Sequence, residues 1–171
     1  MNSANAFSVR PEVPSDVDQI RMVNLDAFPG RGEAELVDKL RRSGSWIPEF
    51  SVIAESHGKV IGHALATRCY IGGHSALALA PCAVLREHQH QGVGTAVIRA
   101  LLEKAEQLGE CFVIVLGHPE YYPRFGFQPA VQRGISLSIE VPEEALMILK
   151  LGDVSLDYPT GQVVYDPAFG I

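Results

Sequence analysis

Hydrophobic positions alternate with polar ones at the start of this chain and then follow a helical period. The alternation over residues 7–13 predicts a first strand, and the three- and four-residue spacing over residues 17–28 predicts a helix. The apolar face of that helix consists of Val17, Ile20, Val23 and Ala27. After a break at residues 29–32, which read PGRG, a similar spacing predicts a second short helix over residues 33–42.

The period changes to two in the middle of the chain. Residues 50–73 contain two β-like runs on either side of the turn residues His57 and Gly58, which predicts a hairpin. Residues 75–84 extend this hairpin, and the continuous apolar run over residues 111–116 predicts a further, buried strand. The middle of the chain therefore supplies consecutive strands.

The stretch between the last two of these strands has the strongest helical pattern. Its apolar face consists of Val93, Ala96, Val97, Ala100, Leu101, Ala105 and Leu108. Residues 121–125 predict a short helix or turn, residues 135–141 and 145–151 are rich in Ile, Leu and Val, and residues 161–165 form another β-like run. The order βααβββαβαβ with a β-rich tail predicts the fold class α/β, a mixed (α+β) sheet with helices on its faces.

Composition narrows the class of protein. A chain of 171 residues with 47% hydrophobic content can bury one core, so a single domain spanning residues 1–171 is expected. The formal charge of −6 argues against broad binding of nucleic acid and favours a neutral or cationic partner. No window approaches the roughly 18 consecutive apolar residues of a membrane span, and the amino terminus lacks a secretory pattern. A cytoplasmic protein without a membrane contact is therefore expected.

Cysteine and histidine spacing gives no sign of a disulfide framework or a metal site. Cys69, Cys82 and Cys111 make an odd number without a CxxC pair, which fits a reducing cytosol. His88 and His90 form an HxH pair, but a zinc site needs further ligands at workable spacing. We therefore expect no metal.

The segment QHQGVG, residues 89–94, follows a predicted strand and opens a predicted helix. Gly92 and Gly94 lack the Cβ atoms that would keep a pyrophosphate from the main chain, and the helix start offers unpaired N–H groups. The alternative is that glycine only lets the strand and the helix pack closely. On the first interpretation, any ligand with a diphosphate could dock here.

Two motifs in this order resemble one family. The spacing of Gln89, Gly92 and Gly94 resembles the QxxGxG or RxxGxG signature of the GNAT superfamily of N-acetyltransferases, which cradles the pyrophosphate of acetyl-CoA. The segment LGHPEYYPRFGF, residues 116–127, resembles that family's short helix and turn ending in Gly-Phe. Together with a closing VVYDPAF, it is similar to the bacterial predicted acetyltransferases grouped around YhbS.

The resemblance implies a fold with splayed central strands and acetyl-CoA as the cosubstrate. The cofactor would lie in the cleft between the strand ending at Val84 and the strand ending at Leu116, and its pantetheine arm would pair with the main chain like an added strand. The pyrophosphate would meet N–H groups at the start of the helix. The cofactor-binding positions expected on this basis are Cys82, Ala83, Val84, Gln89, His90, Gln91, Gly92, Val93, Gly94 and Thr95.

A tyrosine is the expected general acid. When the family motif is aligned on Gly126 and Phe127, Tyr122 takes the place of the tyrosine that faces the thioester sulfur. A phenol with a pKa of about 10 is protonated near neutral pH and can donate to the departing thiolate. Tyr121 takes the role if the register is off by one, and the alternative for both is an aromatic core.

The general base is left open by the sequence. Residues 75–84, where some relatives carry a glutamate, contain no carboxylate. His118 ends the second splayed strand, Glu33 opens the second helix, and His74 is a further candidate. His118 could equally be a loop histidine, and Glu33 an ordinary partner of the helix dipole.

The function expected from these motifs is an acetyl-CoA-dependent N-acetyltransferase that transfers the acetyl group to a primary amine by direct attack in a ternary complex. The oxyanion would meet backbone N–H groups such as that of Val84. The alternatives are a catalytically idle acyl-CoA-binding sensor or partner module, and an acetyltransferase for a protein amino terminus or lysine. A dinucleotide oxidoreductase fits less well, because GVGTAV lacks the GxGxxG pattern. The sequence leaves a monomer and a homodimer equally open.

Overall fold

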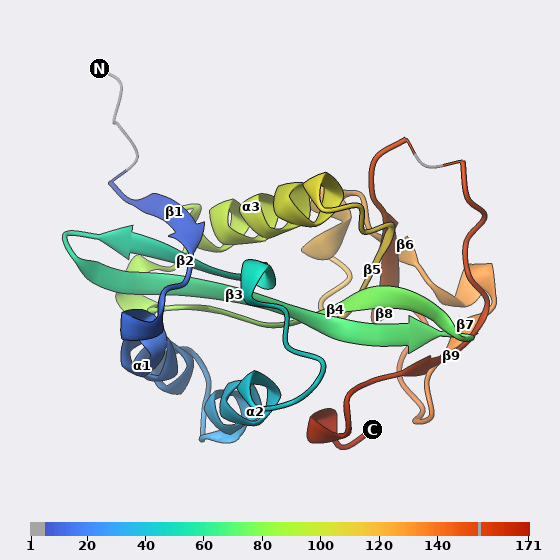
Figure 1. The fold of residues 1–171 in the computed structure, drawn as a ribbon, viewed down its shortest axis with the longest axis horizontal. Helices are drawn as coiled ribbons and strands as arrows, with labels where there is room; N and C mark the ends of the chain where they lie inside the picture. Colours follow the sequence, from blue (N-terminus) through green and yellow to red (C-terminus); the bar gives the residue numbers. More distant parts are fainter. Residues whose placement is uncertain (1–5, 154) are drawn as a thin grey trace.

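A computed structural model describes residues 6–153 and 155–171 of the chain (Figure 1). The α-helices are α1 (Val17–Ala27), α2 (Gly32–Arg41) and α3 (Val93–Gln107). The strands are β1 (Ser8–Pro11), β2 (Ser51–Ser56), β3 (Lys59–Ile71), β4 (His74–Val84), β5 (Phe112–Leu116), β6 (Gln128–Pro129), β7 (Ile135–Ser136), β8 (Leu146–Lys150) and β9 (Gly161–Val164). Short 3₁₀ turns cover Pro14–Asp16, Pro48–Phe50, Arg86–His88, Tyr122–Phe125, Val131–Arg133 and Pro167–Phe169.

The strands form one mixed sheet in the order β1-β2-β3-β4-β5-β8-β6, with β9 paired to the far end of β3 and to β7. Neighbouring strands are antiparallel except in the pairs β4–β5 and β7–β9. Helix α3 lies on one side of the sheet, and α1 and α2 lie on the other (Figure 1). This arrangement confirms the predicted fold class.

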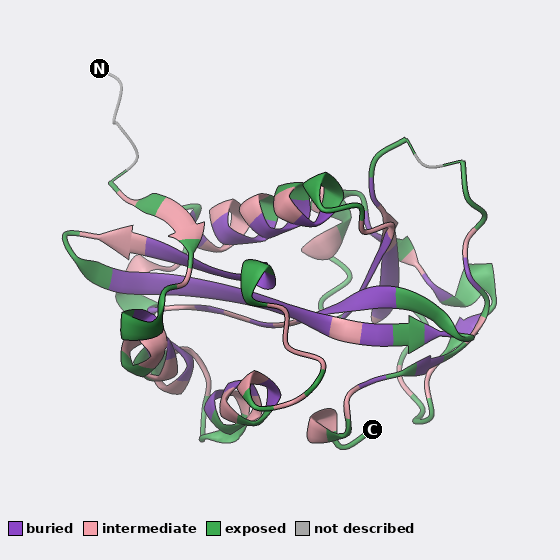
Figure 2. Ribbon diagram, viewed as in Figure 1, coloured by how far each residue is buried: buried purple, intermediate pink, exposed green. Residues whose placement is uncertain are grey.

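Strand β3 is the centre of the core and is buried on both faces. Its residues from Val60 to Thr67 are all buried, because α3 covers one face and α1 the other (Figure 2). His63 is fully buried on the α1 side, where its Nε2 lies 2.9 Å from Ser51 Oγ and its Nδ1 lies 3.4 Å from Asn24 Nδ2. Burial lowers the pKa of His63 to about 3, so the imidazole is neutral.

The β-rich tail differs from the sequence prediction in one place. Of the run over residues 135–141, only Ile135–Ser136 forms a strand, which pairs with Gly161 and Gln162. Apolar composition alone does not make a strand, because the main chain also needs a partner edge. Beyond Ser136 the chain instead forms a loop that contains Pro142, a residue without an N–H to donate.

The parallel pair β4–β5 is open for much of its length. Its registered pairs are Leu77 with Val113 and Ala78 with Ile114, whereas β4 continues to Val84 and β5 to Leu116. On its other side, β4 remains paired with β3 as far as Val84. The split therefore leaves one edge of β4 free to receive a ligand.

Candidate functional site

Backbone groups at the end of β4 point into the split. The Leu85 N–H donates to Ile61 O of β3 at 2.9 Å. Since alternate residues of an antiparallel strand bond to the same neighbour, the N–H and C=O groups of Val84 and Cys82 point the other way. In agreement, Val84 O accepts a hydrogen bond from Gln89 Nε2 at 3.1 Å rather than from β3. The split is thus lined by main-chain groups that an amide-rich ligand can pair with.

Ala83 is turned away from the split. It pairs with His63 of β3 and is 2% exposed. The N–H and C=O groups of Ala83 are already used in the ladder with β3. They are therefore not directed toward a cofactor in the split, which is where the sequence prediction placed them. Just before it, β4 carries Ala80 and Pro81 opposite a single residue of β3, and this bulge lies at the wall of the split.

The predicted glycine cradle is a left-handed turn that leads directly into α3. Gly92 has φ +84° and caps the helix, and His90 has φ +61°. An added Cβ on Gly92 would meet no atom within 4 Å, so the glycine is required by its φ and leaves open space for a ligand. The first N–H groups of α3 face this space and have no partner within the helix.

A cavity of about 640 Å³ lies over this turn. Six of the seven loop positions expected to bind the pyrophosphate line it, and the Gln91 side chain is instead turned back to donate to Glu87 O at 3.2 Å. The residues that line this glycine-loop cavity are Val84, His88, Gln89, His90, Gly92, Val93, Gly94, Thr95, Tyr121 and Arg124.

Arg124 is a cavity residue that the sequence analysis missed. Its guanidinium lies 4.1 Å from the centre of the Tyr121 ring, and its Nε donates to Tyr121 O at 2.8 Å. Two contacts to one residue hold this cation beside the loop, although the chain as a whole is acidic. A fixed positive charge at this position suits a phosphate-bearing ligand.

Two glycines set how closely the elements around the site can approach. An added Cβ on Gly62 of β3 would lie 2.6 Å from Val93 Cγ1, so only glycine lets the first turn of α3 pack against the sheet. An added Cβ on Gly117 would lie 2.5 Å from the Tyr122 ring. Gly117 therefore allows Tyr122 to lie on the main chain at the end of β5. The sequence does not single out either glycine, because each is required by the packed position of a side chain, Val93 for Gly62 and Tyr122 for Gly117.

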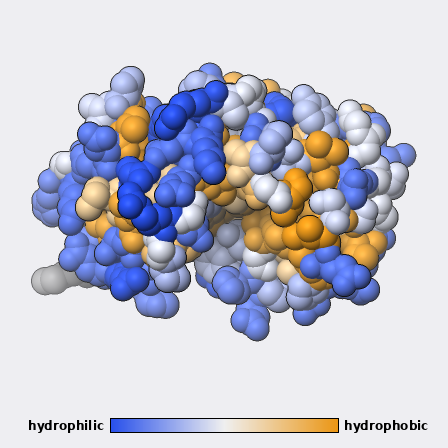
Figure 3. All heavy atoms as spheres, turned by 90° about the horizontal axis from the view of Figure 1, so that it is seen from below, coloured by the Kyte–Doolittle hydropathy of each residue, from blue (hydrophilic) through white to orange (hydrophobic). Residues whose placement is uncertain are grey.

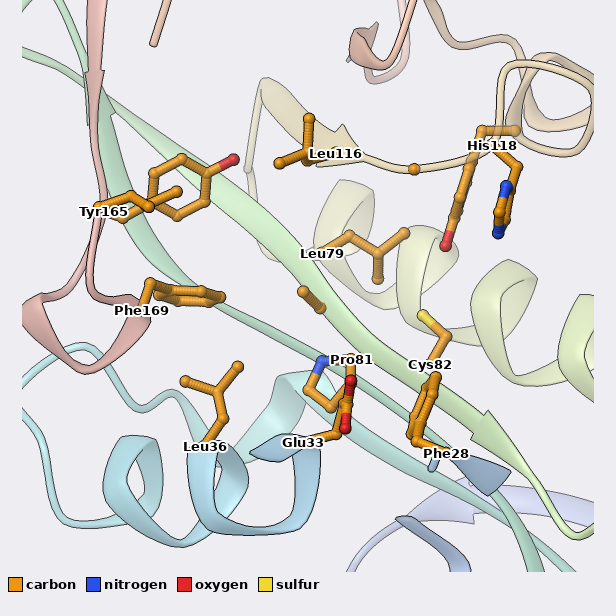
Figure 4. Close-up of a pocket in the computed structure, with 14 residues that line it drawn as sticks. Phe28, Glu33, Leu36, Leu79, Pro81, Cys82, Leu116, His118, Tyr165 and Phe169 are labelled. Atoms are coloured by element: carbon orange, nitrogen blue, oxygen red, sulfur yellow. The ribbon is translucent and has the colours of Figure 1, made fainter. Parts of the chain in front are cut away.

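A second cavity of about 350 Å³ occupies the other end of the split (Figure 4). Its floor is β4, and its walls come from α2, the end of β5 and the C-terminal segment. Hydrophobic residues gather beside a hollow on this side of the molecule (Figure 3). The residues that line this apolar pocket are Phe28, Glu33, Leu36, Leu79, Ala80, Pro81, Cys82, Leu116, Gly117, His118, Tyr122, Tyr165, Phe169 and Ile171.

Tyr122 lines the apolar pocket and is held by aromatic neighbours. Its ring makes edge contacts with Tyr121 and Phe127, at centroid distances of 5.2 and 5.8 Å. Burial raises the pKa of Tyr122 well above the usual value, and the neighbouring Cys82 adds to the shift. The phenol is therefore protonated and directed at the split. Its role as the acid stays a prediction.

Tyr121 lies at the other end of the split, where it lines the glycine-loop cavity. Its hydroxyl oxygen lies 3.4 Å from Thr95 Oγ1. An added Cβ on Gly94 would lie 3.4 Å from this Tyr121 hydroxyl oxygen. The two adjacent tyrosines thus face different cavities, Tyr121 the glycine-loop cavity and Tyr122 the apolar pocket.

Cys82 shares the apolar pocket with Tyr122. Burial raises the pKa of its thiol to about 12, so the sulfur is not a thiolate near neutral pH. A neutral thiol is a poor nucleophile, which favours a packing role for the side chain over a covalent intermediate. Its main chain faces the split, and its contact with the cofactor stays a prediction.

The three candidate bases lie in different places. Glu33 and His118 both line the apolar pocket and approach it from opposite sides of β4 (Figure 4). His74 begins β4 at the hairpin turn, seven residues before Pro81, which is about 23 Å along a strand. This distance takes His74 away from the pocket and leaves Glu33 and His118 as the candidates in reach of it.

Two further findings concern only residues 6–153 and 155–171. No three histidine, cysteine or acidic side chains gather there as a ligand set for a metal ion. None of the helices in this part of the chain has the length and apolar character needed to cross a bilayer.

The mixed sheet, the split parallel pair and the glycine turn at the start of α3 together define the acyl-CoA N-acyltransferase fold. The chain belongs to the GNAT acetyltransferase family, whose model matches residues 17–127, more than half of its length. The resemblance inferred from the motifs around Gly92 and Tyr122 is thereby confirmed at the level of the family.

Individual relatives agree with this assignment. The chain is 42% identical over 135 residues to Escherichia coli YjhQ, named an uncharacterized N-acetyltransferase, covering 76% of this chain and 75% of YjhQ. The crystal structure of Escherichia coli YhbS in complex with CoA matches with a TM-score of 0.92 at 28% identity, over 100% of this chain and 96% of YhbS. A Brucella melitensis GNAT acetyltransferase in complex with acetyl-CoA matches with a TM-score of 0.79 at 30% identity, over 97% and 99% of the two chains.

Proposed function

We propose that this protein is an N-acetyltransferase that moves the acetyl group of acetyl-CoA directly to a primary amine in a ternary complex. The observation that supports it most is the continuity of the two cavities. Val84 and Tyr121 line the glycine-loop cavity, and their near neighbours Cys82 and Tyr122 line the apolar pocket. One extended cofactor can therefore follow β4 from the helix start to the phenol, and the solved relatives with CoA or acetyl-CoA support this ligand.

The proposed cofactor site divides its work between main chain and side chains. The N–H groups from Gly92 to Thr95 receive the pyrophosphate at the positive end of α3, and Arg124 adds a charge beside them. Gln89 fixes the loop to the end of β4 through Val84 O. The pantetheine amides pair with the main chain of Cys82 and Val84.

The proposed reaction has a balanced sequence of bond changes. The neutral amine attacks the thioester carbon, and the Val84 N–H stabilises the oxyanion of the tetrahedral intermediate. The C–S bond then breaks, the CoA sulfur takes a proton from the Tyr122 hydroxyl, and the amine gives up its extra proton to Glu33 or His118. Solvent returns a proton to Tyr122 and takes the proton from Glu33 or His118, so no net proton is released from the neutral amine. Counted from the ammonium form of the acceptor, one proton is released overall.

Release of free CoA thiol tests the proposal, measured from acetyl-CoA with a panel of primary amines. We expect Tyr122→Phe to lower kcat on the order of 10²- to 10⁴-fold, because the departing thiolate loses its proton donor. The dissociation constant for acetyl-CoA should stay the same, since the cradle is intact. Tyr121→Phe is the matched control, and its effect should fall on the KM for acetyl-CoA.

The outcomes separate the rival functions. Acetyl-CoA binding without release by any amine would favour the sensor module, for which the lack of a carboxylate in residues 75–84 is the supporting observation. Release with peptides alone would favour a protein acetyltransferase. Equal turnover by Tyr122→Phe and the parent chain would remove Tyr122 from the mechanism.

A further inference from the structure

The two ends of the apolar pocket are lined by different kinds of side chain. Cys82 and His118 lie toward one end, and the side chains of Leu36, Tyr165 and Phe169 gather at the other (Figure 4). Tyr165 and Phe169 pack together with ring centroids 5.0 Å apart, which gives this end a fixed aromatic wall. A ligand that reaches from the Cys82 end therefore meets aliphatic and aromatic side chains at the far end, with the Tyr165 hydroxyl as a polar group among them (Figure 4).

Glu33 is the only acidic residue that lines the apolar pocket, and every residue of that lining lies in the described part of the chain. Glu35, in the same helical turn of α2, is drawn to Arg31, with 4.0 Å between carboxylate and guanidinium. The carboxylate of Glu33, in contrast, forms no hydrogen bond or ion pair with the described residues, and the side chain lines the pocket. A role limited to the helix dipole does not explain why this carboxylate is directed into the pocket, where it lies near Pro81 (Figure 4).

We infer that the acetyl acceptor is a small primary amine with one positive charge and an aromatic or branched aliphatic group. This inference rests on the proposed acetyl transfer and names its substrate class. Glu33 attracts the ammonium group on entry, and the wall formed by Leu36, Tyr165 and Phe169 receives the apolar group. The amine nitrogen is then held at the end of the pocket that Cys82 and Tyr122 line.

Size and polarity exclude other amines on physical grounds. The pocket of about 350 Å³ must also hold the acetyl end of the cofactor, which leaves room for a small acceptor only. Hydroxyl groups of an amino sugar would lie against Leu36 and Phe169, whose side chains offer no hydrogen-bond partner to replace water. A second ammonium, as in putrescine, would have to leave water against the apolar side chains of Leu36 and Phe169.

A matched amine panel tests the inference by release of CoA thiol. 2-Phenylethylamine and isoamylamine represent the inferred class, and ethanolamine, glucosamine, putrescine and a lysine peptide represent the others. We expect kcat/KM to be at least tenfold higher for the two apolar amines than for ethanolamine, because a hydrophobic group of this size is worth that much in a fitting pocket. Equal or better turnover of the polar amines would overturn the inference while leaving the acetyltransferase proposal intact.

Variants of one helical turn test the role of the carboxylate. Glu33→Gln keeps the shape of the side chain and removes its charge, and Glu35→Gln is the control on the same turn. We expect Glu33→Gln to raise the KM for 2-phenylethylamine about tenfold or more, and Glu35→Gln to leave it unchanged. An unchanged KM in both variants would contradict the assignment of Glu33.

A binding measurement keeps the inference separate from turnover. Calorimetry of 2-phenylethylamine and ethanolamine with the CoA-loaded protein needs no chemistry. Tighter binding of the apolar amine, weakened by Glu33→Gln, supports the inferred ligand class of the pocket. If no acetyl transfer is found in that case, the proposed function fails, and the amine is a ligand rather than an acceptor. No preference between the two amines would remove the inference whatever the turnover.

Discussion

The two ends of the split are built in opposite ways. The glycine-loop cavity is formed mainly by main-chain groups of one short segment, with Gly92 and the first turn of α3 at its centre. The apolar pocket is formed by side chains from α2, β4, the end of β5 and the C-terminal segment. A site made of backbone depends on conformation, whereas a site made of side chains depends on residue identity. The first end can therefore serve one shared cofactor, and the second can be changed for a different acceptor.

The comparison predicts that main-chain conformation is decisive at the glycine-loop cavity, and a change there should have the largest effect on cofactor binding. Gly92→Val places a β-branched residue at φ +84° and fills the space over the turn. The left-handed strain costs about 1–3 kcal/mol. We expect the dissociation constant for acetyl-CoA to rise by about tenfold to hundredfold, measured by calorimetry.

Gly109 provides a matched control for that variant. It follows α3 with φ +85°, and its added Cβ would also meet no atom within 4 Å. Gly109→Val should therefore lower the melting temperature to a similar extent and leave acetyl-CoA binding unchanged. A similar loss of affinity in both variants would mean that global strain, rather than the cavity, causes the effect.

The same contrast explains how much the sequence could reveal. Helices α1, α2 and α3 follow from their apolar spacing, and the cradle follows from two glycines between a strand and a helix, because all these signals are local in the chain. Tyr122 was reached through a neighbouring Gly-Phe turn, which is also local. The sequence alone therefore gave the family, the fold class and the position of the loop.

The far wall of the apolar pocket, formed by Leu36, Tyr165 and Phe169, could not be predicted, because its residues meet only in three dimensions. Leu36 and Phe169 are more than 130 residues apart and carry no motif of their own. Gly117 is required because the Tyr122 ring packs on its main chain, and no sequence pattern signals that contact. Composition predicts a strand over the whole run 135–141, but it does not report whether an edge is free to pair, and only Ile135–Ser136 finds a partner.

A smaller effect is expected from a change in the side-chain wall of the apolar pocket. Phe169→Ala removes the ring that packs on Tyr165 and widens the end that receives the acceptor. We expect kcat/KM for 2-phenylethylamine to fall about tenfold, since one apolar contact in a pocket contributes about 1–3 kcal/mol. The dissociation constant for acetyl-CoA should not change. A change in it would show that the two ends of the split do not act independently.

Val164→Ala is the control for Phe169→Ala. Val164 lies on β9 in the same C-terminal segment, is 57% exposed and does not line the apolar pocket. Its truncation should leave kcat/KM for 2-phenylethylamine and the dissociation constant for acetyl-CoA unchanged. An equal loss in this variant would indicate that the whole segment has loosened.

The smallest effect is an expected absence of alkaline inactivation, and it tests the state of Tyr122. A general acid must be protonated, and burial raises the pKa of this phenol above the usual value of about 10. The neutral form therefore persists below that pH, while the fraction of neutral amine acceptor grows as pH rises. We expect kcat to rise or level off up to pH 9.5 and to show no fall caused by Tyr122. A fall below pH 9.5 in the parent chain that is absent in Tyr122→Phe would show that the pocket stabilises the phenolate, which is opposite to the direction that burial imposes.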